Sequence, residues 1–173
     1  ARILQETIGE DEDNDGTPLL TIQGGSIGAP FDSAVPSFLD LLATPTTQQT
    51  LFVLFVSTTG DGEHCETIKN TWQQLLSKTL YPNQCFANNK NNSFALFCLG
   101  DRAYGPQFCA GGRKLAVRLF QLGVPSYCEV GYGDDNTPNG GVLQDLDTWL
   151  QTVLLPTLLN SHKNARPNNP MMT

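Results

Sequence analysis

The chain has 173 residues, of which 39% are hydrophobic and 16% charged, a composition that suits one compact domain and excludes a fully disordered or fibrous chain. Its formal net charge of −7 disfavours nucleic acid as a partner, whereas a basic protein surface would be attracted to it. No apolar run approaches the ~20 residues of a membrane span, and no signal peptide is visible, so no membrane partner is expected.

The cysteines indicate a reducing compartment. Their number is odd and no Cys-x-x-Cys pair is present, so neither a disulfide framework nor a zinc ribbon is indicated. Free thiols persist where the cell keeps them reduced, and we therefore expect a cytoplasmic protein. The five residues are Cys65, Cys85, Cys98, Cys109 and Cys128.

The first 50 residues carry the weakest pattern, and we expect an N-terminal remnant and irregular region over 1–50. An acidic run at 10–15 and a stretch rich in Gly, Ser and Pro at 24–36 are typical of loops. Residues 17–23 favour a short strand, and residues 37–42 favour one or two helical turns.

From residue 51 onward, strand and helix patterns alternate three times. Each apolar run is short and bounded by turn residues, and the first two are expected to be buried on both faces of a sheet. Apolar residues at helical spacing follow each run, the last set extending from Val142 to Leu154. This order predicts an α/β fold with a parallel sheet over 51–160, and a linker or tail over 161–173. The predicted strands are 51–56, 94–99 and 127–132.

A loop of unusual composition follows each predicted strand directly. The loop at 57–63 offers hydroxyls, backbone N–H groups and two glycines that let a flat ligand come close. The loop at 100–108 carries Tyr104, whose ring can stack on a planar heterocycle. The loop at 133–141 carries two adjacent aspartates, which oppose a second negative charge on a nearby ligand. Because the carboxyl ends of parallel strands share one edge, the three loops together predict a binding site for a flat ligand.

Three segments resemble a known family. They are VSTTGDGE at 56–63, LGDRAYGPQFCAGGRKLAVRLFQLG at 99–123, and GYGDD at 131–135. In combination they resemble the FMN domain of NADPH-dependent diflavin reductases, most closely the soluble type of cytosolic iron–sulfur assembly, over about residues 51–159. The resemblance implies a flavodoxin-like, doubly wound parallel sheet that binds FMN. It also implies an electron-transfer oxidoreductase, in which FMN receives electrons from a reductase half with FAD and NADPH sites and passes them to an iron–sulfur or haem protein.

The resemblance also implies which positions contact FMN. Tyr104 matches the aromatic residue that stacks on the isoalloxazine ring, and Asp135 matches an acidic residue beside the cofactor. The peptide between Gly60 and Asp61 matches one that turns to hydrogen-bond the flavin N5–H. No catalytic residue and no metal ligand is implied. The cofactor-binding residues are Ser57, Thr58, Thr59, Gly60, Asp61, Leu99, Gly100, Asp101, Arg102, Ala103, Tyr104, Gly105, Phe108 and Asp135.

The sequence departs from the family in three places. The family opens with a strand and a Ser/Thr-x-Thr-Gly-Thr loop around the FMN phosphate, and nothing similar precedes residue 51. Because the chain begins at Ala1 rather than Met, we expect that this strand and loop were lost by truncation upstream. The family's Pro-Pro-Asp-Asn is replaced by residues 64–67, His-Cys-Glu-Thr, and its Asn after the second flavin loop is replaced by Cys109.

Other interpretations remain open from the sequence. Residues 24–28 fit the Gly-x-Ser-x-Gly elbow of serine hydrolases, although prolines follow where that motif needs a helix. A metal site at His64, Cys65 and Glu66 would need adjacent residues to share one ion. The main alternative is a flavodoxin-like protein-binding module that has lost FMN, which the acidic surface would also suit.

Overall fold

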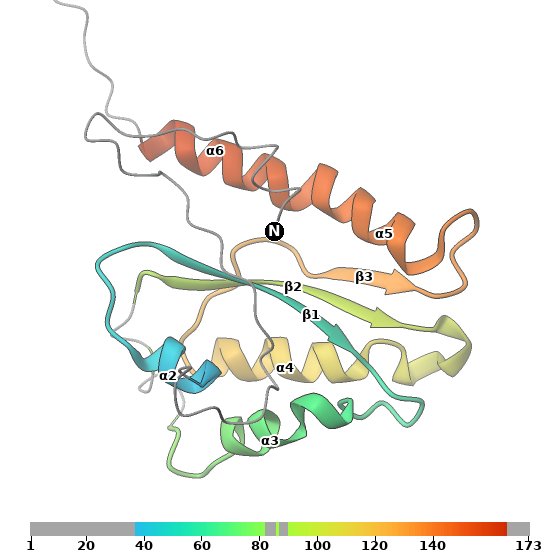
Figure 1. The fold of residues 1–173 in the computed structure, drawn as a ribbon, viewed down its shortest axis with the longest axis horizontal. Coiled ribbons are helices and arrows are strands. Elements are labelled where there is room, and N and C mark those ends of the chain that lie inside the picture. Colours follow the sequence, from blue (N-terminus) through green and yellow to red (C-terminus); the bar gives the residue numbers. More distant parts are fainter. Residues whose placement is uncertain (1–36, 82–85, 87–89, 166–173) are drawn as a thin grey trace, which may run out of the picture.

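The sheet has three parallel strands in the order β1-β2-β3 (Figure 1). The computed structural model describes residues 37–81, 86 and 90–165. The alternation of strands and helices predicted from residue 51 onward is confirmed. The predictions for 1–36, including a strand at 17–23, lie outside the described residues. The elements are α2 (Phe38–Ala43), β1 (Thr50–Ser57), α3 (Glu66–Leu75), β2 (Asn92–Gly100), η1 (Arg102–Gln107), α4 (Ala110–Gln121), β3 (Gly131–Asp134), α5 (Gly141–Trp149), η2 (Leu150–Leu154) and α6 (Leu155–Ala165).

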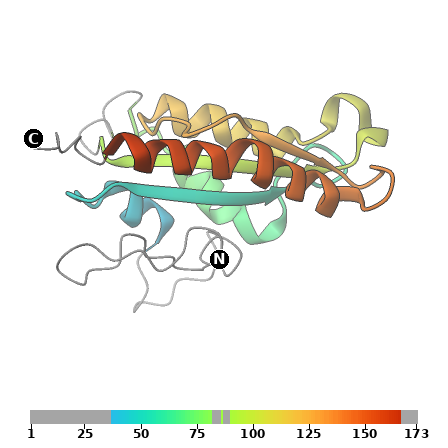
Figure 2. The same ribbon diagram turned by 90° about the horizontal axis from the view of Figure 1, so that it is seen from above.

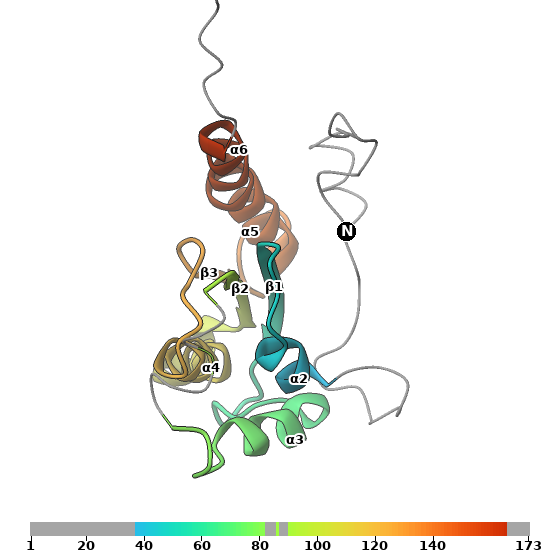
Figure 3. The ribbon, with the colours of Figure 1, turned by 90° about the vertical axis from the view of Figure 1, so that its left-hand side faces the viewer.

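Helices cover both faces of the sheet (Figures 1 and 3). Helices α2, α3 and α4 lie on one face, and the run from α5 to α6 lies on the other. Side chains of β2 alternate between the two cores, because successive residues of a strand point to opposite faces. Leu96 and Cys98 join the core beneath α3 and α4, whereas Ala95 and Phe97 join the core beneath α5. The central strand is therefore buried on both faces, as its sequence predicts.

Strand β1 is less buried than expected. Leu54 and Val56 are buried, but the Phe55 side chain is 52% exposed. The prediction of burial on both faces is thus wrong for the end of this strand. The physical reason is the placement of α5, which packs on β3 and β2 rather than over β1.

The third strand begins later than predicted. Ser126 forms a bridge with Phe94 of β2, and the next pairing joins Gly131 to Phe97. The distance from Phe94 to Phe97 on β2 is three residues, whereas the paired segment runs five residues, from Ser126 to Gly131. Residues 127–130 therefore have no paired residue on β2 and form a bulge. The strand then continues to Asp134, two residues past the predicted end.

The last helix is longer than predicted (Figure 2). Helices α5 and α6 join through the π-helical turn η2 into one continuous run ending at Ala165. Pro156 has no N–H to donate to the preceding turn, and the π turn ends two residues before it, at Leu154. The predicted domain boundary at residue 160 lies within α6, and residues 161–165 continue that helix. Within the described part of the chain, no helix is long and apolar enough to cross a bilayer.

Gly112 is where α4 comes closest to the sheet. A Cβ added there would overlap the Cys98 Sγ and lie 3.0 Å from the Cys98 Cβ. Ala in place of Gly in a helix is normally stabilising by about 1 kcal/mol, but overpacking a core costs typically about 1–3 kcal/mol. We expect Gly112→Ala to lower the free energy of unfolding by about 1–2 kcal/mol in urea denaturation. Adding Cys98→Ala should recover most of this loss, and additive effects of the two changes would contradict the assignment.

Candidate functional site

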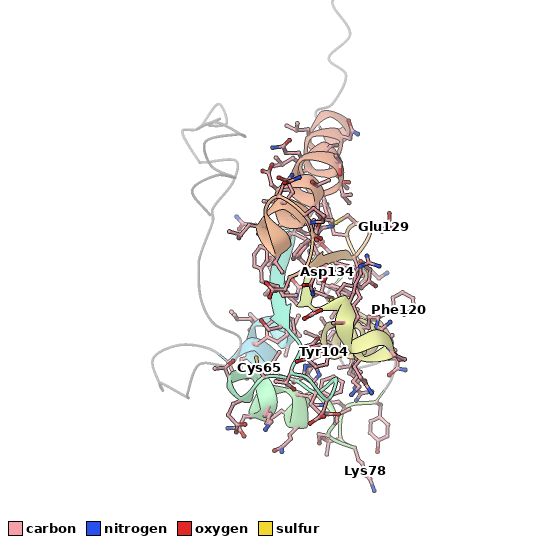
Figure 4. The ribbon with its side chains drawn as sticks, turned by 90° about the vertical axis from the view of Figure 1, so that its right-hand side faces the viewer. Cys65, Lys78, Tyr104, Phe120, Glu129 and Asp134 are labelled. Carbon is pink, nitrogen blue, oxygen red and sulfur yellow. The ribbon has the colours of Figure 1, made fainter. Side chains whose placement is uncertain are left out.

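A hollow of about 470 Å³ lies at the carboxyl edge of the sheet, where all three predicted loops meet. Its volume is within the range of ligand pockets, and Figure 4 views this edge of the molecule with Tyr104 and Asp134 labelled. The lining combines hydroxyls, backbone groups, one aromatic ring and carboxylates. It is formed by Ser57, Thr58, Thr59, Leu99, Gly100, Asp101, Tyr104, Gln107, Cys109, Asp135 and Val142.

The first loop is a tight turn that follows β1. The N–H of Gly62 donates to the Thr59 carbonyl at 2.9 Å, and the N–H of Thr59 donates to the Glu63 carbonyl at 2.9 Å. The peptide between Gly60 and Asp61 is therefore the central peptide of a four-residue turn. Rotation of that peptide leaves both flanking hydrogen bonds in place.

Helix α4 supports the first loop from behind. The N–H of Gly111 donates to the Thr58 hydroxyl at 3.2 Å. The Lys114 Nζ donates to the Gly62 carbonyl at 3.0 Å and pairs with the Glu63 carboxylate at 3.0 Å. This ammonium lowers the pKa of Glu63 below its ordinary value. The loop is thus held at both ends by one helix.

His64 fills the space beneath the same loop. Its side chain is 1% exposed, and its ring centroid lies 4.4 Å from that of Trp72. Neither ring nitrogen has a hydrogen-bond partner among the described residues. Burial lowers the pKa of His64 below its ordinary value of 6.5, and the Lys114 ammonium lowers it further. The imidazole is accordingly neutral near pH 7 and packs as a core residue.

The second loop closes over the first. Tyr104 lies on η1, and its ring Cε1 is 3.3 Å from the position a Cβ of Gly60 would take. The Gln107 side chain occupies the position that a Cβ of Gly62 would take. Gly62 also has a φ of +74°, which favours glycine. The Tyr104 side chain is nevertheless 55% exposed, so its ring remains accessible at the rim of the hollow.

Phe108 faces a different neighbourhood. The Arg102 guanidinium lies 4.9 Å from the Phe108 ring centroid, a cation–π distance, and the Tyr132 ring centroid lies 6.4 Å away. Phe108 therefore packs between η1 and β3 and does not line the hollow. Its contact with Arg102 supports the second loop.

The two aspartates of the third loop have different environments. Asp135 is exposed and lines the hollow, and its N–H donates to the Gly100 carbonyl at 2.9 Å. Asp134 is 7% exposed and its carboxylate pairs with Arg102 at 3.2 Å. Asp134 is the last residue of β3 and Asp135 follows it directly, so their side chains point to opposite sides, as those of successive strand residues do.

The structure brings most of the predicted residues to one place. Eight of them line the hollow, and Gly60 lies against the Tyr104 ring. The lining does not include Gly60 itself, nor Asp61, Arg102, Ala103, Gly105 or Phe108.

The hollow is also lined by three residues that the sequence analysis does not predict: Gln107, Cys109 and Val142. Gln107 belongs to the predicted second loop, and Val142 is the first apolar residue of the last predicted helix, so position could have indicated both. Cys109 adopts the left-handed conformation with φ 53° at the start of α4. The family's Asn at this position tolerates that conformation well, which is the signal that could have found it. Burial raises the pKa of Cys109 to about 11, so its thiol is protonated near pH 7.

No group of three or more His, Cys, Asp or Glu side chains within the described ranges is placed to hold a metal ion. The Gly-x-Ser-x-Gly motif at 24–28 lies outside those ranges.

Comparison with known proteins assigns the family. The family model described as flavodoxin matches residues 28–149. The chain belongs to the flavodoxin family. FMN is the cofactor that this membership implies, and the predicted α/β flavodoxin-like fold is confirmed.

Curated relatives extend the similarity to diflavin reductases. The chain is 36% identical over 104 residues to the NADPH-dependent diflavin oxidoreductase 1 of Cryptococcus neoformans var. neoformans, covering 60% of the chain and 16% of the relative. It is 34% identical over 118 residues to the protein of that name in Arabidopsis thaliana, covering 68% and 18%. It is 36% identical over 83 residues to methionine synthase reductase of Mus musculus, covering 48% and 11%. The chain thus spans less than a fifth of the length of these relatives.

A solved structure is also similar. A cysteine mutant of flavodoxin from Pseudomonas aeruginosa matches with a TM-score of 0.45 at 24% identity, covering 58% of this chain and 62% of that chain.

The residues present fit the isoalloxazine part of FMN. Gly60 lets the Tyr104 ring pack at the rim of the hollow, and Gly100 lets the backbone of Cys109 approach β2. The hydroxyls of Ser57, Thr58 and Thr59 and the exposed Tyr104 ring are suited to a flat ring with a polar edge.

Proposed function

We propose that this chain holds FMN at the carboxyl edge of its sheet and is the electron-transfer module of an NADPH-dependent diflavin oxidoreductase. Electrons would come from a reductase half that binds FAD and NADPH, and would pass to an iron–sulfur or haem protein. The observation that carries the proposal is the convergence of three loops on one hollow, with the Tyr104 ring beside Gly60.

The chain's own residues would bind and orient the cofactor. The loop from Ser57 to Asp61 would face the ring edge, residues 99–105 and Phe108 would form the second side, and Tyr104 would stack on the ring. Bound FMN supplies one-electron chemistry, and the protein supplies position and electrostatics. The central peptide of the first turn would present either its carbonyl or its N–H to the ring. The Asp135 carboxylate would oppose negative charge on that ring.

Charge supports a protein acceptor. The net charge of −7 favours encounter with a basic surface through long-range attraction. We infer an iron–sulfur protein as the acceptor because the three loop segments resemble the diflavin reductases of cytosolic iron–sulfur assembly. Free Cys65, Cys98, Cys109 and Cys128 support a reducing, cytoplasmic setting.

The test is a flavin titration of the 173-residue chain. We expect FMN to bind with quenched fluorescence, and Tyr104→Ala to weaken binding about tenfold or more, because stacking on an aromatic side chain is worth about 1–3 kcal/mol. Riboflavin, which has the same ring and no phosphate, should lose the same factor. The control is Tyr81→Ala, which removes a 63% exposed ring that does not line the hollow.

The same titration distinguishes the proposed function from the alternative, a protein-binding module without FMN. A chain that binds neither FMN nor riboflavin would favour a flavodoxin-like module that keeps only a protein-binding role. Unchanged flavin affinity in Tyr104→Ala would remove the stacking role from the proposal.

A further inference from the structure

The carboxylate of Asp134 joins the third loop to the second. Its Oδ1 accepts from the N–H of Arg102 at 3.1 Å and from the N–H of Asn136 at 3.1 Å, and its Oδ2 pairs with the Arg102 Nε at 3.2 Å. The Asp134 side chain is largely buried, whereas the Arg102 side chain is 69% exposed, so the contacts to backbone N–H groups are better shielded from water than the ion pair. Asp134 therefore uses both oxygens on protein groups and, unlike Asp135, does not line the hollow.

The backbone of Asp134 is fixed independently. It pairs with Gly100 at the end of the β2–β3 ladder, and its N–H donates to the Asp145 carboxylate at 2.8 Å. The carboxylate thus projects from a rigid strand end toward η1, whose first residue is Arg102. Because this strand end is rigid, the Asp134 side chain can determine where η1 begins.

The first turn of η1 depends on two carboxylates. Asp134 accepts from the N–H of Arg102, and Asp101 accepts from the N–H of Ala103 at 2.7 Å. The Asn136 amide donates to Asp101 at 2.6 Å and connects the two. Tyr104 follows in the same turn, so the position of its ring relative to Gly60 depends on this capping.

We propose that Asp134 is a positioning residue for the flavin site. It acts through η1 to hold the Tyr104 ring in place beside Gly60, and it does not touch FMN itself. The consequence for FMN rests on the proposed function, whereas the placement of Tyr104 can be measured without any flavin.

The flavin-free test uses the Tyr104 ring as a reporter. The ring current of a tyrosine this close to Gly60 shifts the Gly60 Hα resonances in proton NMR, and Tyr104→Ala should remove the shift. We expect Asp134→Asn to remove at least half of it, because the amide loses the charge that pairs with Arg102 and offers one oxygen instead of two. Asp147→Asn is the matched control, since it makes the same change on the exposed face of α5, where the Asp147 carboxylate accepts from the Gln151 amide, and it leaves Asp134 and η1 untouched.

The flavin test is a double-mutant cycle. We expect Asp134→Asn alone to weaken FMN binding about tenfold and to increase the fluorescence of bound FMN. In the Tyr104→Ala background the same change should have little further effect, because it acts through the ring that is already absent. Fully additive losses would overturn the proposal, as would an unchanged Gly60 shift in Asp134→Asn.

Two further outcomes are separable. If the unmodified chain binds no FMN, the proposed function fails, and the Gly60 shift still decides the positioning role. If Asp134→Asn does not fold, Arg102→Gln decides, because it removes the exposed side-chain half of the pair and keeps the backbone contact. A partial loss of the Gly60 shift in Arg102→Gln supports the role, and no loss overturns it.

Discussion

Gly131→Ala is expected to lower the free energy of unfolding by about 3 kcal/mol, the upper end of the usual overpacking cost. A Cβ at Gly131 would overlap the Phe97 ring and lie 2.7 Å from the Trp149 Cγ and Cδ1. Both rings are buried, with ring centroids 5.4 Å apart. The Trp149 indole N–H donates to the Glu129 carbonyl at 2.9 Å, which keeps the ring from moving aside.

Urea denaturation of Gly131→Ala measures this cost directly. The double variant Gly131→Ala with Phe97→Leu should be less destabilised than the sum of the single changes, because the smaller side chain leaves room for the methyl group. Gly105→Ala is a control with open space around its Cβ, where only the backbone φ of +55° resists the change. A loss below about 0.5 kcal/mol at Gly131 would show that the interface between α5 and the sheet repacks readily.

The glycines of the Gly-x-Gly-Asp-Asp segment thus serve packing rather than ligand contact. A Cβ at Gly133 would also meet Phe97, at 2.8 Å, and Val142 of α5 at 3.1 Å. The sequence shows only that glycines stand next to aspartates, and that pattern is equally typical of a ligand-binding turn. The reason for these glycines is a helix that begins several residues later and folds back over them.

The positions of the loops were predictable because they follow from local patterns. Apolar runs mark the strands, and parallel strands place their following loops at one edge whatever the exact register. Tyr104 and Asp135 are therefore expected beside the first loop whatever the register, and both line the hollow together with residues 57–59. The shared edge is also why most of the predicted site residues line one hollow.

The division of work between Asp134 and Asp135 was not predictable, because the third strand was expected to end two residues too early. With both aspartates in a loop, the local pattern does not distinguish them, and only the family resemblance selects Asp135 as the residue beside the cofactor. The bulge at 127–130 shifts the strand toward the carboxyl end, and only then does strand alternation turn one carboxylate inward. Exposure of Phe55 was missed for a related reason, since a strand's sequence does not show where a distant helix will pack.

His64 is expected to make the chain less stable as the pH falls below about 6.5. Its folded-state pKa is lowered, by burial and then by Lys114, so the unfolded chain takes up a proton that the folded chain resists. The contribution of neutral His64 to the free energy of unfolding is therefore complete above the pKa of the unfolded chain, and it is lost as the pH falls toward the pKa of the folded chain. The slope is at most about 1.4 kcal/mol per pH unit for one proton.

The measurement is urea denaturation of the unmodified chain and of His64→Leu at pH 7.5, 6.5 and 5.5. Leu has a similar volume and no proton to gain, so the variant should lose less stability than the unmodified chain between pH 6.5 and 5.5. At pH 7.5 it should be as stable or slightly more stable, because neither His64 nitrogen has a partner among the described residues. Working above pH 5 keeps the titration of Glu63 out of the comparison, since its pKa is lowered from 4.5.

Imidazole NMR separates this effect from other titrations. The chain has two histidines, and the signal lost in His64→Leu identifies the buried one. Its pKa should lie below 6.5, and parallel stability curves for the two proteins would contradict the assignment. Because Thr58 and His64 form a bridge at the base of the first loop, protonation of this ring would act on the segment that lines the hollow. Loss of stability at low pH should therefore begin at the carboxyl edge of the sheet, with earlier exchange of the Thr58 and Thr59 amides than of those in β2.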